Sequence, residues 1–212
     1  MDFEIIKPAD IEKRSFAIIT EELGDRVFPE EIGLVVKRVI HTSADFDYAD
    51  NLVFSEGAVP RALEAIRNGA HIVTDTNMVK AGINKKTLAK FGGEVHCFVV
   101  DADVAEEAKQ RGVTRSTVSM ERAAKLDVPV IFAIGNAPTA LIELDRLMRE
   151  QDLKPELIIG VPVGFVNVVE SKELILQSQA PHIVARGRKG GSNVAAAIVN
   201  ALLYQLVHRE GF

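Results

Sequence analysis

Five short apolar runs rich in β-branched residues recur along the chain after residue 70, and most are followed by segments with helical spacing of apolar positions. Runs that are apolar at nearly every position are typical of strands buried on both faces, as in a parallel sheet covered by helices. These runs are residues 71–74, 95–100, 129–134, 157–161 and 182–185. Their alternation with helices predicts an α/β fold, namely a three-layer, Rossmann-like parallel sheet of about five strands with helices on both faces.

The first 69 residues have a different pattern, with helical spacing over 9–23, 30–41 and 56–68. We expect them to form a helical N-terminal lead-in that packs on the sheet. A chain of 212 residues with 47% hydrophobic content can bury a full core. We therefore predict a single domain over residues 1–212.

Later helices are preceded by short polar residues, which favour helix starts because their side chains accept hydrogen bonds from the first free backbone N–H groups. The predicted caps are Thr114 for a helix to residue 126, Asn136 for a helix over 137–151, and Ser192 for a helix to about residue 208.

Composition narrows the class of protein. A net charge of -5 makes a nucleic-acid surface unexpected, since such surfaces carry a basic excess. The one cysteine, Cys97, lies in an apolar run and cannot form an intrachain disulfide, which favours a reducing cytoplasm. No apolar run approaches the roughly 18 residues of a membrane span, and the N-terminus lacks the pattern of a signal peptide. We expect a cytoplasmic protein without membrane or nucleic-acid partners.

The loop after the last predicted strand is basic and glycine-rich. Arg186, Arg188 and Lys189 precede Gly190-Gly191-Ser192 at a predicted helix start. Basic side chains and free N–H groups at such a position bind phosphate or carboxylate. The alternative is a solvated loop whose glycines serve close packing. Neither a Walker loop nor a GxGxxG motif is present, which argues against a nucleotide-dependent enzyme.

His41 ends an apolar helical run and is a candidate proton donor, because an imidazole with a pKa near 6.5 suits acid–base chemistry at neutral pH. The alternative is a histidine that only caps the negative end of the helix dipole. The remaining histidines show no metal-binding spacing, so we predict no protein metal site. The acidic residues after His41, such as Asp45 and Asp47, are typical of turns.

Arg115 lies in the first turn of a predicted helix, where the dipole disfavours a cation unless an anion binds there or a carboxylate pairs with it. It is either a carboxylate clamp or one half of an ion pair. Arg14-Ser15 is a second candidate pair, although an arginine on a helix surface is ordinary.

Several segments together resemble the precorrin-8X methylmutase family, nearly from end to end. They are RSFAII at 14–19, HTSADFDY at 41–48, TRS at 114–116, AIGNAPTAL at 133–141, PVGFV at 162–166, RGR at 186–188 and GGS at 190–192. The acidic continuation after His41 is more similar to the cobalt-precorrin-8 branch than to the metal-free one. Motifs in the same order over the whole chain are far more specific than any single glycine pattern.

The resemblance implies a homodimer with the site near the subunit interface, and an isomerase that moves a methyl group from carbon 11 to carbon 12 of the corrin ring in cobalamin biosynthesis. It implies that His41 is catalytic and that no cofactor is needed. The implied corrinoid-binding residues are Arg14, Ser15, Arg115, Ser116, Gly164, Phe165, Arg186, Arg188, Gly190, Gly191 and Ser192.

A polycarboxylate macrocycle fits the local basic groups of an otherwise acidic chain, and its flat ring needs an apolar floor. Candidate floor residues are Phe16, Met78, Val79, Val163 and Phe165. We hypothesise that the His41 imidazolium protonates or hydrogen-bonds a ring nitrogen and so lowers the barrier of a sigmatropic methyl shift. A tetrapyrrole-binding carrier without catalytic activity is the alternative function.

Overall fold

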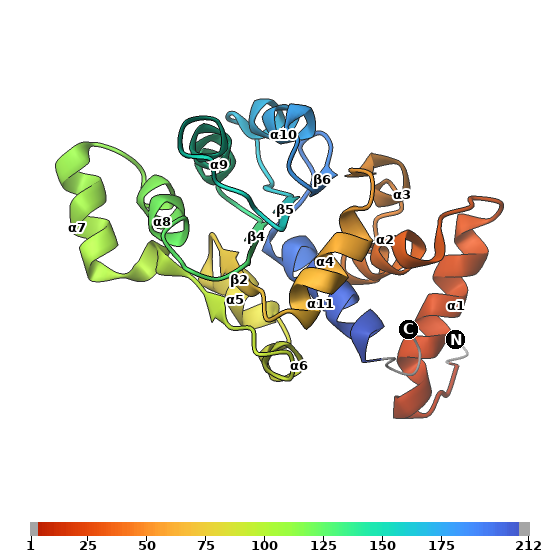
Figure 1. Cartoon of the computed structure of the whole chain (residues 1–212). Coiled ribbons are helices and arrows are strands. Elements are labelled where there is room, and N and C mark those ends of the chain that lie inside the picture. Colours follow the sequence, from red (N-terminus) through yellow and green to blue (C-terminus); the bar gives the residue numbers. More distant parts are fainter. Residues whose placement is uncertain (1–3, 208–212) are drawn as a thin grey trace.

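The computed structural model describes residues 4–207 and contains one six-stranded sheet (Figure 1). Its spatial order is β1-β6-β5-β4-β2-β3, and the strands after β1 all run parallel. The strands are β1 (Leu52–Phe54), β2 (His71–Thr74), β3 (Val95–His96), β4 (Val130–Ile134), β5 (Leu157–Gly160) and β6 (His182–Ala185). The α/β class and the run-to-strand assignments are thereby confirmed.

The alternate side chains of the central strands divide the core into two parts. Ile131 and Ile159 face a cluster that includes the first helices and the last helix, whereas Phe132 and Ile158 face a second cluster on the other side. All five residues of β4 are buried. Burial on both faces explains why the sequence is apolar at nearly every strand position.

Two details of the predicted sheet are wrong. β1 was not predicted, because three residues between helices carry too little pattern; it pairs antiparallel with β6, so the sheet is mixed. The predicted strand over 95–100 ends at His96 and continues as a 3₁₀ helix, η2 (Phe98–Val100). Within residues 4–207 its only partner is β2, which ends at Thr74. The Thr74 hydroxyl donates to the His96 carbonyl at 3.1 Å, and no strand of the described part of the chain pairs with the residues that follow.

Helices cover both faces, as predicted (Figure 1). α8 (Arg115–Ala123), α9 (Pro138–Gln151) and α10 (Val168–Gln177) cover one face, with α7 (Ala102–Arg111) outside them. The other face carries α4 (Ala58–Arg67), α5 (Asn77–Gly82), α6 (Lys85–Ala89) and α11 (Ser192–Leu206). The predicted lead-in is present as η1 (Pro8–Asp10), α1 (Ile11–Leu23), α2 (Glu30–Ser43) and α3 (Tyr48–Asn51). α2 packs along α11 and against α1.

Only one of the three predicted caps is correct. Thr114 caps α8 by accepting the N–H of Thr117 at 3.1 Å. α9 is preceded by Ala137 rather than capped by Asn136, because the N–H groups there bind another side chain, described below. Ser192 is the first residue of α11 and Gly191 precedes it; residue 208 lies outside the described residues. Within residues 4–207, no helix has both the length and the apolar character needed to cross a bilayer.

Candidate active site

The loops that follow β2, β4, β5 and β6 meet at the carboxyl edge of the sheet, where parallel α/β folds bind ligands. The strand order reverses between β2 and β4, and at this switch point lies the buried carboxylate of Asp75. It accepts the N–H groups of Gly135, Asn136 and Ala137 at 2.9, 2.7 and 2.6 Å. Burial raises the pKa of Asp75, and these three hydrogen bonds oppose that rise. A protein carboxylate therefore occupies the place where a nucleotide phosphate would bind.

The glycine-rich loop after β6 lies directly against the end of β5. A Cβ at Gly190 would be 2.1 Å from the carbonyl oxygen of Val161, so only glycine fits there. Gly191 donates its N–H to the same oxygen at 2.8 Å, and Gly164 donates to the carbonyl of Arg188 at 3.2 Å. At Gly190 the structure therefore supports close packing, the alternative explanation for these glycines. This packing holds the loop 186–192 beside the loop that follows β5.

A lysine that the sequence analysis did not single out holds this loop from behind. Lys172 of α10 is fully buried, and its Nζ donates to the carbonyls of Gly187 and Lys189 at 2.7 and 2.8 Å. Burial lowers the pKa of Lys172 to about 8. Its positive charge lies beneath the loop that was predicted to bind an anion.

The three basic side chains of the loop have different surroundings. Lys189 binds the carboxylates of Asp45 and Asp47, each at 2.6 Å, and Arg186 pairs with Glu173 at 3.0 Å. The guanidinium of Arg188 lies 5.4 Å from the ring centre of Phe165. Among the described residues no carboxylate pairs with Arg188, so it is the basic group of this loop best placed for an external anion.

Those ion pairs of Lys189 connect the loop to the turn that follows His41. His41 is exposed in the last turn of α2, and its ring stacks on Phe16 of α1 with centroids 5.3 Å apart. The guanidinium of Arg38 lies 4.7 Å from the centre of the Phe16 ring and forms an ion pair with Glu12. The pKa of His41 is lowered by partial burial and by Arg38, while Glu12 acts in the opposite direction. The imidazole is therefore mainly neutral at pH 7 before any ligand binds.

Arg14 and Ser15 lie on α1, two residues and one residue before Phe16 respectively. Arg14 is exposed and pairs with Glu4 at 3.0 Å, and the Ser15 hydroxyl donates to the carbonyl of Ile11 at 3.0 Å. Their position on the helix that packs against α2 places them on the His41 side of the molecule.

Arg115 and Ser116 lie at the start of α8. Ser116 is buried, whereas Arg115 is exposed, and no carboxylate among residues 4–207 pairs with it. The ion-pair explanation for Arg115 therefore finds no support, and the carboxylate clamp remains. The start of α8 is linked to the start of α9 by Thr114 and Thr139, whose hydroxyl oxygens are 3.2 Å apart.

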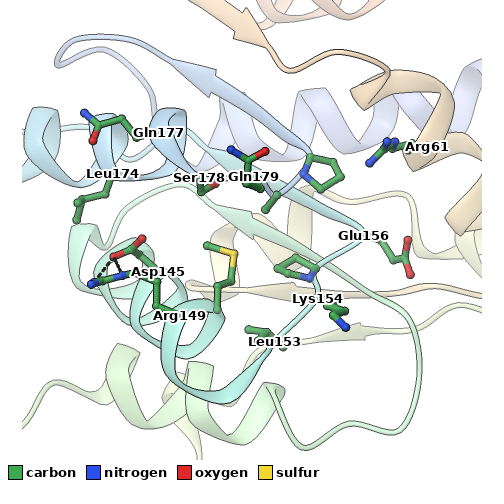
Figure 2. A pocket seen from close by; sticks show the side chains of 14 residues that line it. Arg61, Asp145, Arg149, Leu153, Lys154, Glu156, Leu174, Gln177, Ser178 and Gln179 are labelled. Atoms are coloured by element: carbon green, nitrogen blue, oxygen red, sulfur yellow. Dashed lines mark hydrogen bonds and ion pairs between the residues drawn. The ribbon is translucent and has the colours of Figure 1, made fainter.

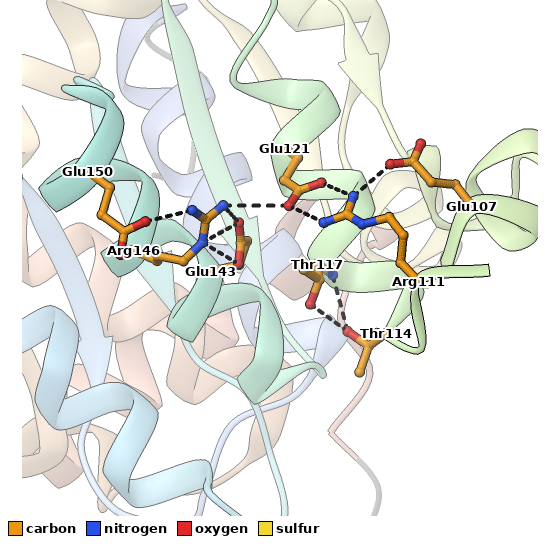
Figure 3. Close-up of polar contacts among 8 residues, drawn as sticks. All are labelled: Glu107, Arg111, Thr114, Thr117, Glu121, Glu143, Arg146 and Glu150. Carbon is orange, nitrogen blue, oxygen red and sulfur yellow. Dashed lines mark hydrogen bonds and ion pairs between the residues drawn. The ribbon is translucent and has the colours of Figure 1, made fainter. Parts of the chain in front are cut away.

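A network of arginines and glutamates connects α7, α8 and α9 (Figure 3). Arg111 binds Glu107 at 2.6 Å and both oxygens of Glu121, and Arg146 binds Glu143 at 2.5 Å. Arg146 also lies 3.5 Å from Glu121, which joins the two halves. The network ties α8 to α7 and α9 without using Arg115.

One chain does not bring all the predicted site residues together. α2 packs on α11 and α3, whereas α8 packs on α9, α7 and η2, and the two helices lie at different ends of the sheet (Figure 1). We call the first group, around His41 and the loop 186–192, the histidine region. The second group, Arg115 and Ser116 at the start of α8, is the arginine region.

Comparison with known proteins shows what this chain is similar to. The family model described as precorrin-8X methylmutase matches residues 10–205. The chain belongs to the precorrin-8X methylmutase family. It is 48% identical to the cobalt-precorrin-8 methylmutase of Priestia megaterium over 93% of this chain and 88% of that one. It is 46% identical to the same-named protein of Salmonella typhimurium strain LT2, over 95% of this chain and 97% of that one.

A solved structure agrees with this family assignment. The precorrin-8X methylmutase of Thermus thermophilus superposes with a TM-score of 0.86 at 38% identity, and the match covers 94% of this chain and 98% of that one. The precorrin-8X methylmutase resemblance predicted from the sequence motifs is thereby confirmed.

Only some of the side chains predicted to form an apolar floor for the flat corrin ring are exposed to a ligand. Met78, Val163 and Phe165 are exposed at the carboxyl edge, at 71%, 48% and 79% of their surface. Val79 is fully buried in the core and cannot contact a ligand, so its assignment to the floor is wrong. Phe16 is buried, and its ring stacks on the imidazole of His41.

A cavity of about 810 Å³ lies elsewhere in this methylmutase fold, near the starts of β5 and β6 (Figure 2). Its walls include Arg149 of α9, Leu174 of α10 and Arg61 of α4. None of the predicted site residues lines it. This cavity is therefore separate from the predicted site residues.

Proposed function

We propose that this protein catalyses the shift of a methyl group from carbon 11 to carbon 12 of the corrin ring of (cobalt-)precorrin-8, an isomerisation in cobalamin biosynthesis. The observation that carries the proposal is the exposed His41, whose following turn is joined to the basic loop 186–192 by Lys189, in a chain of the precorrin-8X methylmutase family. No atom is gained or lost in such a shift, so the protein has to supply only orientation and charge.

His41 is the proposed acid. Protonation or hydrogen bonding of a ring nitrogen withdraws electron density from the π-system and lowers the barrier of the sigmatropic shift. In the ligand-free protein Arg38 opposes the protonated form, because it lowers the pKa of His41. A bound polycarboxylate adds negative charge near the imidazole, which raises its pKa again. Substrate binding thus favours the protonated form of His41, the proposed proton donor.

Substrate carboxylates are the proposed partners of the unpaired arginines. Arg115 and Arg188 are exposed, and no carboxylate among the described residues pairs with either. Arginine binds carboxylates through two parallel hydrogen bonds, which orients the ligand as well as holding it. The buried charge of Lys172 supports Arg188 by keeping the loop in place.

We further propose a homodimer whose site lies near the subunit interface. The separation of the histidine and arginine regions within one chain supports this arrangement, because two-fold symmetry can bring the start of α8 of one subunit to His41 of the other. The exposed apolar side chains of Val163, Phe165 and Val166 at the carboxyl edge are suited to contact either the corrin ring or the second subunit.

The cobalt-containing form is the proposed natural substrate, since the relatives from Priestia megaterium and Salmonella typhimurium are named for it. A cytoplasmic location is proposed as well, and the buried free thiol of Cys97 agrees with a reducing compartment.

Anaerobic incubation of the purified protein with cobalt-precorrin-8, and separately with the metal-free substrate, tests the function. Moving the methyl group off carbon 11 frees that atom to join the conjugated path, so turnover must change the visible spectrum. We expect a catalytic change, faster with the cobalt form. Tight binding of both substrates without isomerisation would contradict the proposal and support the carrier alternative.

A further inference from the structure

Two histidines and a glutamate converge outside the candidate active site, at the edge of the sheet formed by β2 and β3. One possible ligand atom from each of His71, Glu94 and His96 lies within 4.8 Å of the other two. The parallel pairing of β2 with β3, in which Val73 is opposite His96, creates this cluster from residues that are far apart in the sequence. The sequence spacing therefore gave no sign of it.

The two imidazoles face each other directly. Nδ1 of His71 and Nε2 of His96 are 2.8 Å apart, with ring planes 22° from each other. Two nitrogen lone pairs at that distance repel unless an electropositive centre lies between them, which is either a proton or a metal ion. The geometry requires one of these centres and provides nitrogen ligands for it.

The surroundings of the pair shift the pKa of His96 in both directions. Partial burial, His71 and Lys80 lower the pKa of His96, whereas Glu94 raises it. Glu94 supplies one carboxylate beside the two rings. Two imidazoles and a carboxylate form a combination that binds divalent transition metals.

We propose that His71, Glu94 and His96 bind one divalent transition-metal ion, with Zn²⁺ as the best fit. Imidazole nitrogens and a carboxylate oxygen are its ordinary ligands, and three protein ligands leave a fourth position for water. Tetrahedral Zn–N distances of about 2.0–2.1 Å place the two nitrogens roughly 3.3 Å apart, so the rings need to separate by only about 0.5 Å. Both histidines are half-buried, which permits such a movement.

Binding of the metal ion affects the stability of the sheet edge at β3. β3 is a two-residue edge strand, and η2 follows it immediately. Asp101, next to η2, binds Arg122 of α8 at 2.9 Å, so this edge also supports the helix that carries Arg115. A metal bound to the folded state but not to the unfolded chain raises the stability of this part of the fold. The site is separate from the proposed isomerase chemistry.

The test uses full-length protein without a polyhistidine tag, freed of metal by a chelator and dialysed. Zn²⁺ is titrated calorimetrically, and Co²⁺ is added as a coloured substitute whose visible absorption reports tetrahedral coordination. We expect one ion per chain and a Zn²⁺-dependent rise in the melting temperature. His96→Gln should weaken Zn²⁺ binding by at least the roughly 10–100-fold that follows loss of an outer-shell partner.

Glu94→Gln provides a variant at an exposed position that should fold normally, and Glu64→Gln on α4 is its matched exposed control. The first should bind Zn²⁺ more weakly and shift the Co²⁺ spectrum, while the second, like His41→Gln, should bind as the wild type does. Absence of stoichiometric Zn²⁺ binding would overturn the proposal and assign the pair to a shared proton. Wild-type affinity in His96→Gln or Glu94→Gln would overturn the three-ligand site.

Discussion

The histidine region and the arginine region differ in how their charges are satisfied within the chain. In the histidine region, Lys189 and Arg186 already have carboxylate partners, and Lys172 holds the loop from below. In the arginine region, the ion pairs join α8 to α7 and α9, and Arg115 itself is exposed and pairs with no carboxylate among the described residues. The first region is organised in advance around His41, whereas the second offers a charge that only an outside group can satisfy.

This difference separates two roles. A preorganised proton donor affects the rate of the chemical step, because the surrounding groups do not need to rearrange during reaction. An unpaired surface arginine affects ligand binding, because the ligand replaces water and gains a charge-assisted hydrogen bond. The two regions should respond differently to substitution, which the following experiments measure.

The largest effect is expected for His41→Ala. Loss of the proton donor should lower kcat by about 10²–10⁴-fold while the substrate Kd stays close to the wild-type value. Stopped-flow spectroscopy under anaerobic conditions separates the two quantities. Lys37→Ala, on the same helix, is the control and should retain its turnover. Near wild-type turnover in His41→Ala would contradict the role given to the histidine region.

Arg115→Ala should act mainly on binding. Leaving a substrate carboxylate without its guanidinium costs about 2–5 kcal/mol, seen as a weaker Kd with a smaller change in kcat. Arg186→Ala is the informative comparison, because its partner Glu173 already satisfies the charge, and a smaller loss is expected. Equal affinity of Arg115→Ala and wild-type protein would remove the arginine region from the site.

The pH dependence of turnover tests the acid form of His41. Because the pKa of His41 in the free protein is lowered, kcat/KM should fall as pH rises through a value below 6.5. Bound carboxylates raise that pKa, so the corresponding fall in kcat should occur at higher pH. A kcat that stays constant between about pH 5 and 8 would show that the proton of an imidazolium is not used.

A smaller effect concerns the loop support. The pKa of Lys172 is lowered from 10.5 to about 8 in the folded protein, so between these values the unfolded chain binds more protons. Stability should rise with pH across that window, by at most about 3 kcal/mol, and this rise should be missing in Lys172→Met. Denaturant unfolding of both proteins at pH 7.5 to 10.5 measures it. Parallel pH profiles would contradict a buried lysine charge at this position.

The sequence predicted those parts of the fold that depend on local pattern. Buried strands such as β4 and β5 are apolar throughout, so their composition identifies them. β1 could not be predicted, because it consists of three residues and depends on pairing with β6, more than 100 residues away in the chain. The shortening of β3 likewise depends on where its neighbour ends, which local composition does not contain.

Candidate site residues were predictable where the residue type and its position in a helix are informative by themselves. His41 was identified because an imidazole suits acid–base chemistry at neutral pH, and Arg115 because a cation in the first turn of a helix is disfavoured unless an anion pairs with it. Lys172 was not identified, since a lysine in an amphipathic helix ordinarily faces solvent, and only the tertiary fold buries it against two carbonyls. The role of Asp75 was not predicted, because its three N–H partners come from a segment sixty residues later.

Mixing two impaired variants tests most directly whether the two regions form one site across a dimer. His41→Ala and Arg115→Ala proteins are unfolded together, refolded and assayed with cobalt-precorrin-8 at a concentration well below the Kd of Arg115→Ala, where each variant alone turns over poorly. If His41 of one subunit works with Arg115 of the other, each mixed dimer has one intact site, and the mixture should recover about one quarter of wild-type turnover. Recovery no greater than the average of the two separate variants would contradict the shared site.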